Sequence, residues 1–372
     1  MDTTGRKPEM TRKERVRRSI EHQPIDRVPI HINATKWVVK KLKQTLQVGS
    51  DRELLEKLRA DIYDMRGIDI HSGVTPRYAG PPNPLFPADW AGNSMSFWGI
   101  REFEKETASG WMFEAERPPL AGEITLEEAR NYPWARIEWF DFSELKEKLL
   151  PWKDFALMAS GGSVFQHATF VRGMDYLMMD MCIHPDLAHY VLGRISDFYY
   201  AYFERMLQAA EGLIDILAVA DDLGMQQSLL ISPEMFDEYI APALKRMADL
   251  AHAYDAKFLL HTCGNIEALI PRFIELGVDV LDPIQPEAMN PIGIKERYGA
   301  DITLRGGVSI QDVVSRKSPE EVRSEVKRIA EALKKGSGYI FSPGHPVLQD
   351  DVPVENILAM YEAGYMYGQT ND

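Results

Sequence analysis

The second half of the chain alternates between short apolar runs and longer amphipathic segments. The runs have the length of β-strands and are apolar almost throughout, as expected for strands that are buried on both faces. They are Ile214–Ala220, Lys257–His261, Val278–Asp282, Ile302–Arg305 and Tyr339–Ser342. This alternation predicts a parallel sheet whose strands are connected by helices.

The segment Glu320–Lys335 gives the clearest helix signal. Ser318 is a suitable N-cap, Pro319 fits the first helical position, and Glu321 completes a capping box. The apolar residues of the segment fall on one helical face, and Gly336 ends it. Two further predicted helices with a similar pattern are Pro233–Tyr254 and Asn265–Leu276.

The first half of the chain adds three candidate strands, Val28–Asn33, Ile62–His71 and Phe155–Ala159, after an amphipathic helix over residues 10–22. Eight strands in all predict an α/β fold of one domain, a (β/α)8 TIM barrel spanning residues 1–372. An open doubly wound sheet is the alternative. No GxGxxG follows any predicted strand, so nothing supports a dinucleotide site.

The stretch over residues 72–120 departs from this alternation because it is rich in proline, glycine and aromatic residues. We interpret it as an inserted lobe or hairpin near the barrel mouth. A long insertion at that place is often a lid or a substrate wall. A small satellite core under a loop is the alternative interpretation.

Composition narrows the class of protein. The 372 residues include 42 Lys and Arg against 56 Asp and Glu, a formal net charge of −14. This disfavours binding to nucleic acid or to an anionic membrane. No run approaches the roughly 18 apolar residues of a membrane span, and the N-terminal residues lack the apolar core of a signal peptide. A cytoplasmic location is therefore expected.

The chain has two cysteines, which excludes a disulfide framework and a four-cysteine zinc site. A catalytic or metal-bound thiolate remains open. In a (β/α)8 barrel the catalytic residues come from the carboxyl ends of the strands and the loops that follow. The polar residues after the five apolar runs of the second half include Asp221, Asp222, His261, Cys263, Asn265, Gln285, Arg305 and His345.

His261 and Cys263 form the sharpest local signal. An imidazole and a thiolate two residues apart can bind one ion, and both are good zinc ligands. A buried cysteine beside a hydrogen-bonded histidine is the alternative. Asn265 opens the next helix, where backbone N–H groups can hold an anion.

The other candidates at the rim also have two interpretations each. Asp221 and Asp222 are metal ligands, general acids or bases, or caps of the segment Leu223–Gln227. His345 lies in a turn of glycine and proline, which favours a function. His167 and Arg172 flank glycines after the third predicted strand and are candidate substrate-binding residues at the mouth.

Seven motifs together resemble the uroporphyrinogen decarboxylase superfamily. They are Gln23–Pro29, Ala220–Gly224, Ile231–Phe236, Leu260–Asn265, Asp282–Pro286, Arg305–Val308 and Ser342–Ile357, and the resemblance runs from about residue 11 to residue 368. It implies a single (β/α)8 barrel. It also implies one of two chemistries, because the superfamily contains cofactor-free decarboxylases and cobamide-dependent methyltransferases.

The decarboxylase branch binds its polycarboxylate tetrapyrrole through an arginine-rich segment after the first strand. The matching stretch here, residues 28–37, contains no arginine. One lysine does not replace bidentate guanidinium groups. This departure argues against uroporphyrinogen decarboxylation, and His31 remains in the stretch as a candidate substrate-binding residue.

The methyltransferase branch resembles the chain at His261 and Cys263, which match two of its zinc ligands. The third ligand there is usually a cysteine in the last-strand loop, a region that has none here. His345 is the nearest substitute, with Asp222 as the alternative. The resemblance implies zinc, a cobamide carried by a separate corrinoid protein, a small-molecule substrate, and dimers, which are common in the family.

Three functions follow as expectations. The first is a zinc-dependent, corrinoid-linked methyltransferase or demethylase, with Asp221, Asp222, Gln285 and Arg305 as candidate catalytic residues. The second is a decarboxylase-type lyase without a cofactor that acts on a tetrapyrrole or another carboxylate. The third is a non-catalytic ligand-binding barrel.

Overall fold

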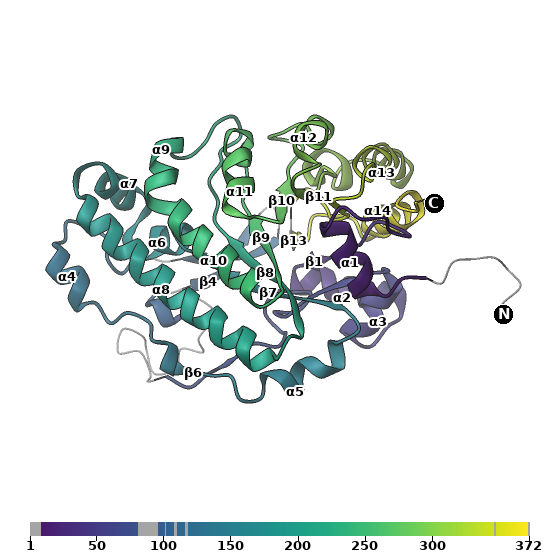
Figure 1. Ribbon diagram of the computed structural model, residues 1–372. Helices are drawn as coiled ribbons and strands as arrows, with labels where there is room; N and C mark the ends of the chain where they lie inside the picture. Colours follow the sequence, from purple (N-terminus) through teal and green to yellow (C-terminus); the bar gives the residue numbers. More distant parts are fainter. Residues whose placement is uncertain are drawn as a thin grey trace, which may run out of the picture.

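The computed structural model describes residues 9–80, 96–100, 102–107, 110–115, 118–345 and 347–370. Within these ranges a parallel sheet of seven strands has the order β12-β11-β10-β9-β8-β7-β2. Its strands are β2 (Ile62–Asp64), β7 (Ala156–Gly162), β8 (Ile214–Ala220), β9 (Lys257–His261), β10 (Val280–Ile284), β11 (Thr303–Gly306) and β12 (Tyr339–Ile340). The strands lie at the centre of the molecule, with helices around them (Figure 1).

The segment predicted as the first strand closes the curled sheet into a barrel. Ile30 forms a parallel bridge with Phe341, and the N–H of His31 donates to the Phe341 carbonyl at 3.0 Å. On its other side, the N–H of Asp61 donates to the Ile30 carbonyl at 2.8 Å. This closure confirms the barrel and excludes the open sheet. The regular strand in this region is β1 (Asn33–Ala34), which pairs with β13 (Val347–Leu348).

The strand predictions were accurate where apolar runs are unbroken. Strands β8 and β9 begin and end at the predicted residues. The prediction Ile62–His71 was wrong in its second half, because β2 ends at Asp64 and the chain turns through Gly67 with φ of 92°. Glycine adopts this backbone conformation at no steric cost.

Alternation along the strands explains why they are apolar throughout. Ile216 and Ala218 of β8 belong to the cluster inside the barrel, together with Met158 and Leu259. Their neighbours on the strand, including Leu217, face the surrounding helices. Each strand is therefore buried on both faces, as a parallel barrel requires.

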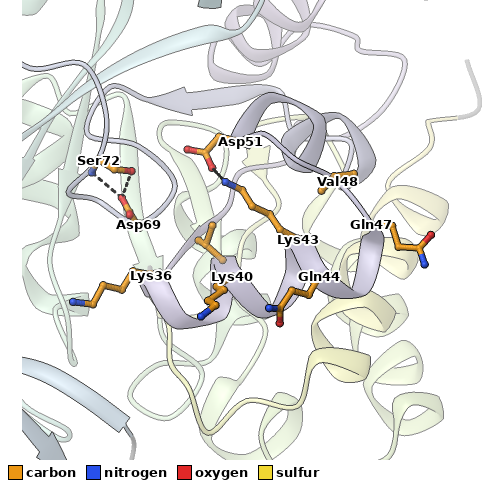
Figure 2. A pocket seen from close by; sticks show the side chains of 10 residues that line it. Lys36, Lys40, Lys43, Gln44, Gln47, Val48, Asp51, Asp69 and Ser72 are labelled. Atoms are coloured by element: carbon orange, nitrogen blue, oxygen red, sulfur yellow. Dashed lines mark hydrogen bonds and ion pairs between the residues drawn. The ribbon is translucent and has the colours of Figure 1, made fainter.

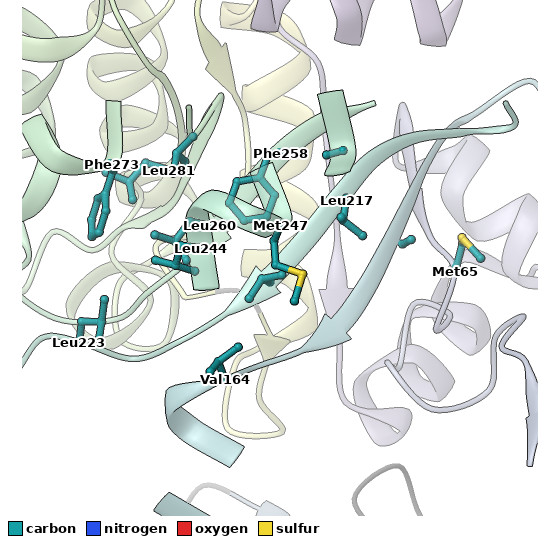
Figure 3. Close-up of a cluster of buried hydrophobic side chains, with 14 of the residues drawn as sticks. Met65, Val164, Leu217, Leu223, Leu244, Met247, Phe258, Leu260, Phe273 and Leu281 are labelled. Carbon is teal, nitrogen blue, oxygen red and sulfur yellow. The ribbon is translucent and has the colours of Figure 1, made fainter. Parts of the chain in front are cut away.

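Fourteen α-helices occur in the described ranges. Their bounds are α1 (Arg12–Ile20), α2 (Lys36–Leu46), α3 (Asp51–Lys57), α4 (Leu126–Asn131), α5 (Leu145–Leu149), α6 (Phe165–Arg172), α7 (Met174–Ile183), α8 (Pro185–Ala210), α9 (Pro233–Met235), α10 (Ala241–Ala253), α11 (Ile270–Leu276), α12 (Pro291–Tyr298), α13 (Pro319–Leu333) and α14 (Val354–Tyr367). Figure 3 shows part of the outer core, where Phe258 of β9 lies beside Met247 of α10. No helix among the described residues combines the length and the apolar character that crossing a membrane requires.

Two predicted helices show how local sequence decides an element. Helix α13 has the predicted capping box, in which Ser318 and Glu321 each accept from the other's backbone N–H. The predicted helix Pro233–Tyr254 is instead divided into α9, a π-turn over Phe236–Ile240, and α10. Pro242 lies at the start of α10 and has no N–H to donate into the preceding turn.

Helix α1 closes the amino-terminal end of the barrel. Its Val16 and Ile20 join the cluster inside the barrel. Arg15 is not on a solvated face, as the sequence suggested, but is 1% exposed. Its Nη1 donates to Asp61 Oδ1 at 2.7 Å, and the same carboxylate accepts from both terminal nitrogens of Arg27.

The predicted insertion over residues 72–120 contains an antiparallel hairpin of β4 (Glu102–Thr107) and β5 (Gly110–Ala115). Before it, β3 (Arg77–Tyr78) pairs with β6 (Phe140–Asp141). Trp98 is buried, and its Nε1 donates to the hydroxyl of Tyr199 on α8 at 3.1 Å. Residues 81–95 of the expected lobe lie outside the described residues.

Candidate metal centre and substrate cavity

Three metal-ligand side chains converge at the carboxyl ends of β8 and β9. Cys263 Sγ lies 3.6 Å from His261 Nε2, and Asp222 Oδ1 lies 3.7 Å from the same nitrogen. The three donor atoms all lie within 4.8 Å of one another. Zinc with a nitrogen ligand at about 2.0–2.1 Å and a thiolate at about 2.3 Å holds these two atoms about 3.5 Å apart in tetrahedral geometry. The cluster therefore fits a zinc ion without rearrangement of the nitrogen and sulfur.

A close approach of two loops brings the cluster together. Gly264 has φ of 86°, and a Cβ on it would lie 2.4 Å from the carbonyl carbon of Gly224. A Cβ on Gly224 would lie 2.7 Å from the Cys263 carbonyl oxygen. Because neither glycine has a side chain, the Cys263 N–H reaches Asp222 Oδ1 at 2.9 Å.

His261 is oriented by a buried carboxylate. Its Nδ1 lies 2.7 Å from Asp282 Oδ2, which leaves Nε2 facing Cys263. Burial alone would lower the pKa of His261, but the hydrogen bonds to Asp282 and Cys263 outweigh it and raise the pKa to about 10. The raised pKa reflects the negative groups around the ring, which equally favour a metal cation. Carboxylate partners of this kind commonly orient metal-ligating histidines.

Asp282 also contacts a second cation. Its Oδ1 lies 2.9 Å from Nε of Arg305, and both side chains are 2% exposed. Arg305, foremost among its charged neighbours, helps hold the pKa of Asp282 low against the effect of burial. The carboxylate thus stays ionised between His261 and Arg305.

The cluster opens into a cavity of about 420 Å³ inside the barrel mouth. Asp222 and His261 line one part of it. The polar residues elsewhere in its lining are Asn33, Asp64, Arg66, His71, Ser160, Ser163, Gln166, His167, Asp282 and Arg305, and the apolar residues include Ile70, Met158, Phe170, Val219, Leu259 and Val347. This size and mixture suit a small organic molecule.

A larger surface groove, of about 560 Å³, contains none of the cluster residues. Lys36, Lys40 and Lys43 follow one face of α2 along it (Figure 2). Lys43 pairs with Asp51 at 2.6 Å. The groove has no nucleophile or metal-ligand cluster, so the cavity above is the better candidate site.

Two predicted catalytic residues support the site from below. Asp221 is fully buried and does not line the cavity. It accepts from the Ser163 hydroxyl at 2.6 Å and from the N–H groups of Val164 and Gln166 at the start of α6. Gln285 accepts from the N–H of Gly264 at 3.1 Å. These contacts fix α6 and the cysteine loop.

Three other predicted residues also lie outside the lining. Arg172 was expected at the mouth, but its Nε donates to Asp180 at 2.7 Å and its Nη1 donates to the Leu120 and Gly122 carbonyls. This corrects the expectation, because the guanidinium ties α6 to α7 and to the end of the insertion. Asn265 Oδ1 accepts from the Glu267 N–H at 3.4 Å. It too has a local structural contact.

His345 was the first choice for the third metal ligand, but Asp222 takes that place in the cluster. The Nδ1 of His345 faces the Val347 carbonyl at 3.3 Å. The ring is still close enough to the cluster for His261 to lower its pKa further, after burial as the main cause. His31 is fully buried and also lies outside the lining.

His167 does line the cavity, as expected. Its Nδ1 lies 3.0 Å from the Ser163 carbonyl and 2.9 Å from the Tyr199 hydroxyl. A carbonyl accepts only from a protonated nitrogen, so Nδ1 carries the hydrogen and Nε2 is the acceptor. Burial lowers the pKa of His167 to about 4, which keeps the ring neutral.

The sequence analysis missed Asp64, Arg66 and Ser160. Asp64 Oδ1 accepts from the backbone N–H of Arg66 at 2.9 Å and from the Ser160 hydroxyl at 2.5 Å. These residues follow the end of β2 or lie near the end of β7. The predicted strand Ile62–His71 ran past this end, so the rule that polar residues follow a strand was not applied to Asp64 and Arg66.

Comparisons with known proteins agree with this architecture. A family model described as uroporphyrinogen decarboxylase (URO-D) matches residues 143–367, more than half of the chain. A solved structure of a methyltransferase from Methanosarcina mazei has a TM-score of 0.67 and 18% sequence identity, and the match covers 96% of this chain and 99% of that one. This likeness shows the fold.

Curated relatives include proteins of both chemistries. A methylated-thiol–coenzyme M methyltransferase of Methanosarcina mazei is 26% identical over 202 residues, 54% of this chain and 50% of that protein. A uroporphyrinogen decarboxylase of Sulfurovum sp. is 25% identical over 221 residues, 57% of this chain and 59% of that protein. The chain thus spans about half to three-fifths of the length of these relatives.

Proposed function

Because the chain belongs to the uroporphyrinogen decarboxylase family, we propose that it is a zinc-dependent methyltransferase or demethylase that works with a separate corrinoid protein. The observation that carries this proposal is the donor set of Asp222, His261 and Cys263. Three protein ligands and one open position are typical of a catalytic zinc. The likeness to a methylated-thiol methyltransferase supports the same chemistry.

When bound at these residues, zinc would lower the pKa of a thiol so that its thiolate accepts a methyl group. The chain's own residues prepare the site for this. Asp282 holds His261 with Nε2 toward the cavity, and the Cys263 N–H holds Asp222 in place. His167 presents a neutral acceptor nitrogen to the same cavity.

Metal content tests the proposal directly. We expect about one equivalent of zinc in protein purified without chelator, as for a single three-ligand site. Cys263→Ala should lose it, whereas Cys182→Ala should keep it because Cys182 is exposed and outside the cluster. Equal zinc in the wild type and Cys263→Ala would contradict the assignment.

The third ligand needs its own comparison. Asp222→Ala should lose zinc, and His345→Ala should retain it, because Asp222 and not His345 completes the cluster. The opposite result would restore the ligand set of two histidines and one cysteine that the sequence suggested. Methyl transfer from free methylcobalamin to a small thiol then tests the activity. Anaerobic turnover of uroporphyrinogen without such transfer would favour the lyase.

A further inference from the structure

The cavity contains two guanidinium groups that the metal cluster does not use. Arg66 and Arg305 line the same cavity as Asp222 and His261. Arg66 comes from the loop after β2, and Arg305 comes from β11. The arginines that the first-strand segment lacks are thus replaced by two from other parts of the barrel.

Arg305 has donors to spare although it is buried. Its Nε faces Asp282 Oδ1 at 2.9 Å, and its Nη1 lies 3.8 Å from the Met158 sulfur, a weak acceptor. Its Nη2 has no hydrogen-bond partner among the described residues. A guanidinium has five N–H donors, so most of those on Arg305 remain available to a group in the cavity.

Arg66 is held at its Nε and Nη2 and leaves its other end available. The Nε donates to the Ser160 hydroxyl at 2.7 Å, and the Nη2 lies 3.3 Å from Asp64 Oδ2. The Nη1 forms no hydrogen bond within the described part of the chain. Asp64 and Ser160 therefore fix the direction of the side chain without using all its donors.

A buried imidazole shows that the two arginines face a common region. His31 is fully buried, and neither of its ring nitrogens has a hydrogen-bond partner. Burial is the main cause that holds its pKa well below the ordinary value, and Arg305 and Arg66 lower it further. The imidazole is thus neutral, and its N–H adds another unpaired donor near both guanidiniums.

This excess of unpaired donors favours a ligand group with several acceptor atoms. Carboxylate, sulfonate and phosphate groups have this chemistry and bind guanidinium bidentately. Met158, Val219 and Leu259 supply apolar lining in the same cavity. They suit a short carbon chain between such a group and the metal cluster.

We propose that the substrate is a small molecule with an anionic head group, which binds Arg66 and Arg305 while its reactive end lies at Asp222, His261 and Cys263. The position of the reactive end rests on the proposed function. The anion subsite itself rests on the two arginines and on His31.

Matched probes test the subsite by calorimetry on the zinc-loaded full chain. The carboxylate 3-mercaptopropionate should bind at least tenfold more tightly than the neutral alcohol 3-mercapto-1-propanol. Arg66→Gln should reduce this preference to less than about threefold, since each charge-assisted contact contributes 1.5–3 kcal/mol. A sulfonate of the same chain length, 3-mercapto-1-propanesulfonate, distinguishes the two head groups.

Two further variants keep the test interpretable. Arg136→Gln removes an exposed arginine outside the cavity and should leave the preference unchanged. Arg305→Lys keeps the charge beside Asp282 but loses the planar fork, and it should also weaken the preference. A carboxylate that binds no better than the alcohol, including no measurable binding of either, overturns the subsite. Carboxylate preference without methyl transfer overturns only the proposed function.

Discussion

His167 shows how one side chain combines packing with chemistry. Its ring is stacked on Tyr199 at 5.3 Å and lies 6.4 Å from Trp98. The Ser163 carbonyl decides which nitrogen carries the hydrogen. The sequence placed this residue at the mouth, but it did not reveal the neutral state, which depends on burial by residues from α8 and from the insertion.

His167→Asn tests that neutral state through pH. In the folded protein the ring takes up a proton only near pH 4, whereas in the unfolded chain it does so near pH 6.5. Unfolding therefore binds a proton between these values, and stability falls as the pH falls through this window. The wild type should lose up to about 3 kcal/mol from this group.

Urea unfolding at pH 7 and at pH 4.5 measures the effect. The loss of stability between the two pH values should be smaller in His167→Asn than in the wild type, whatever the stability of the variant at pH 7. An identical loss in both proteins would show that the folded ring titrates normally.

At the scale of elements, the strongest constraint is the closure of the barrel. Asp61 is fully buried and accepts from Arg15, Arg27 and the N–H of Ile30. It therefore joins α1, the closing segment and β2 through one carboxylate. Removing its charge leaves two buried guanidiniums without a partner.

Asp61→Asn should lower the free energy of unfolding by about 3–5 kcal/mol, the usual cost of breaking a buried ion pair from one side. Urea unfolding followed by circular dichroism measures this. Asp255→Asn is the matched control, because Asp255 is exposed and pairs with the exposed Arg17. The control should be nearly neutral, and a neutral Asp61→Asn would show that the closure does not depend on this carboxylate.

Element prediction succeeded where local sequence is sufficient and failed where distant contacts decide. Strands β8 and β9 are continuous apolar runs, and the cap of α13 is encoded within four residues. The closing segment is different, because its hydrogen bonds go to Phe341 and Asp61. Likewise, adjacency in sequence suggested His261 with Cys263, but only the approach of Gly224 to Gly264 selects Asp222 over His345.

At the scale of the whole molecule, the proposed metal couples local binding to global stability. The cluster joins the loops after β8 and β9, which pack against the rest of the sheet. A ligand that binds the folded state alone stabilises it by about 2.7 kcal/mol at a hundredfold excess over its Kd. Zinc should therefore raise the midpoint of thermal unfolding.

Thermal unfolding with zinc and with a chelator checks this expectation. The wild type and Cys182→Ala should shift upward with zinc and downward after chelation, whereas Cys263→Ala should not respond. An equal response of Cys263→Ala would place the stabilising metal elsewhere on the protein.

One carboxylate, Asp282, lies between the two ends of the cavity, with Oδ2 on His261 and Oδ1 on Arg305. An anion that draws on Arg305 leaves more of the negative charge of Asp282 for His261, and a cation at His261 has the converse effect on Arg305. Thermodynamic linkage makes such coupling reciprocal. Occupancy at either end therefore changes affinity at the other by the same factor, so metal and substrate are not independent ligands of this barrel.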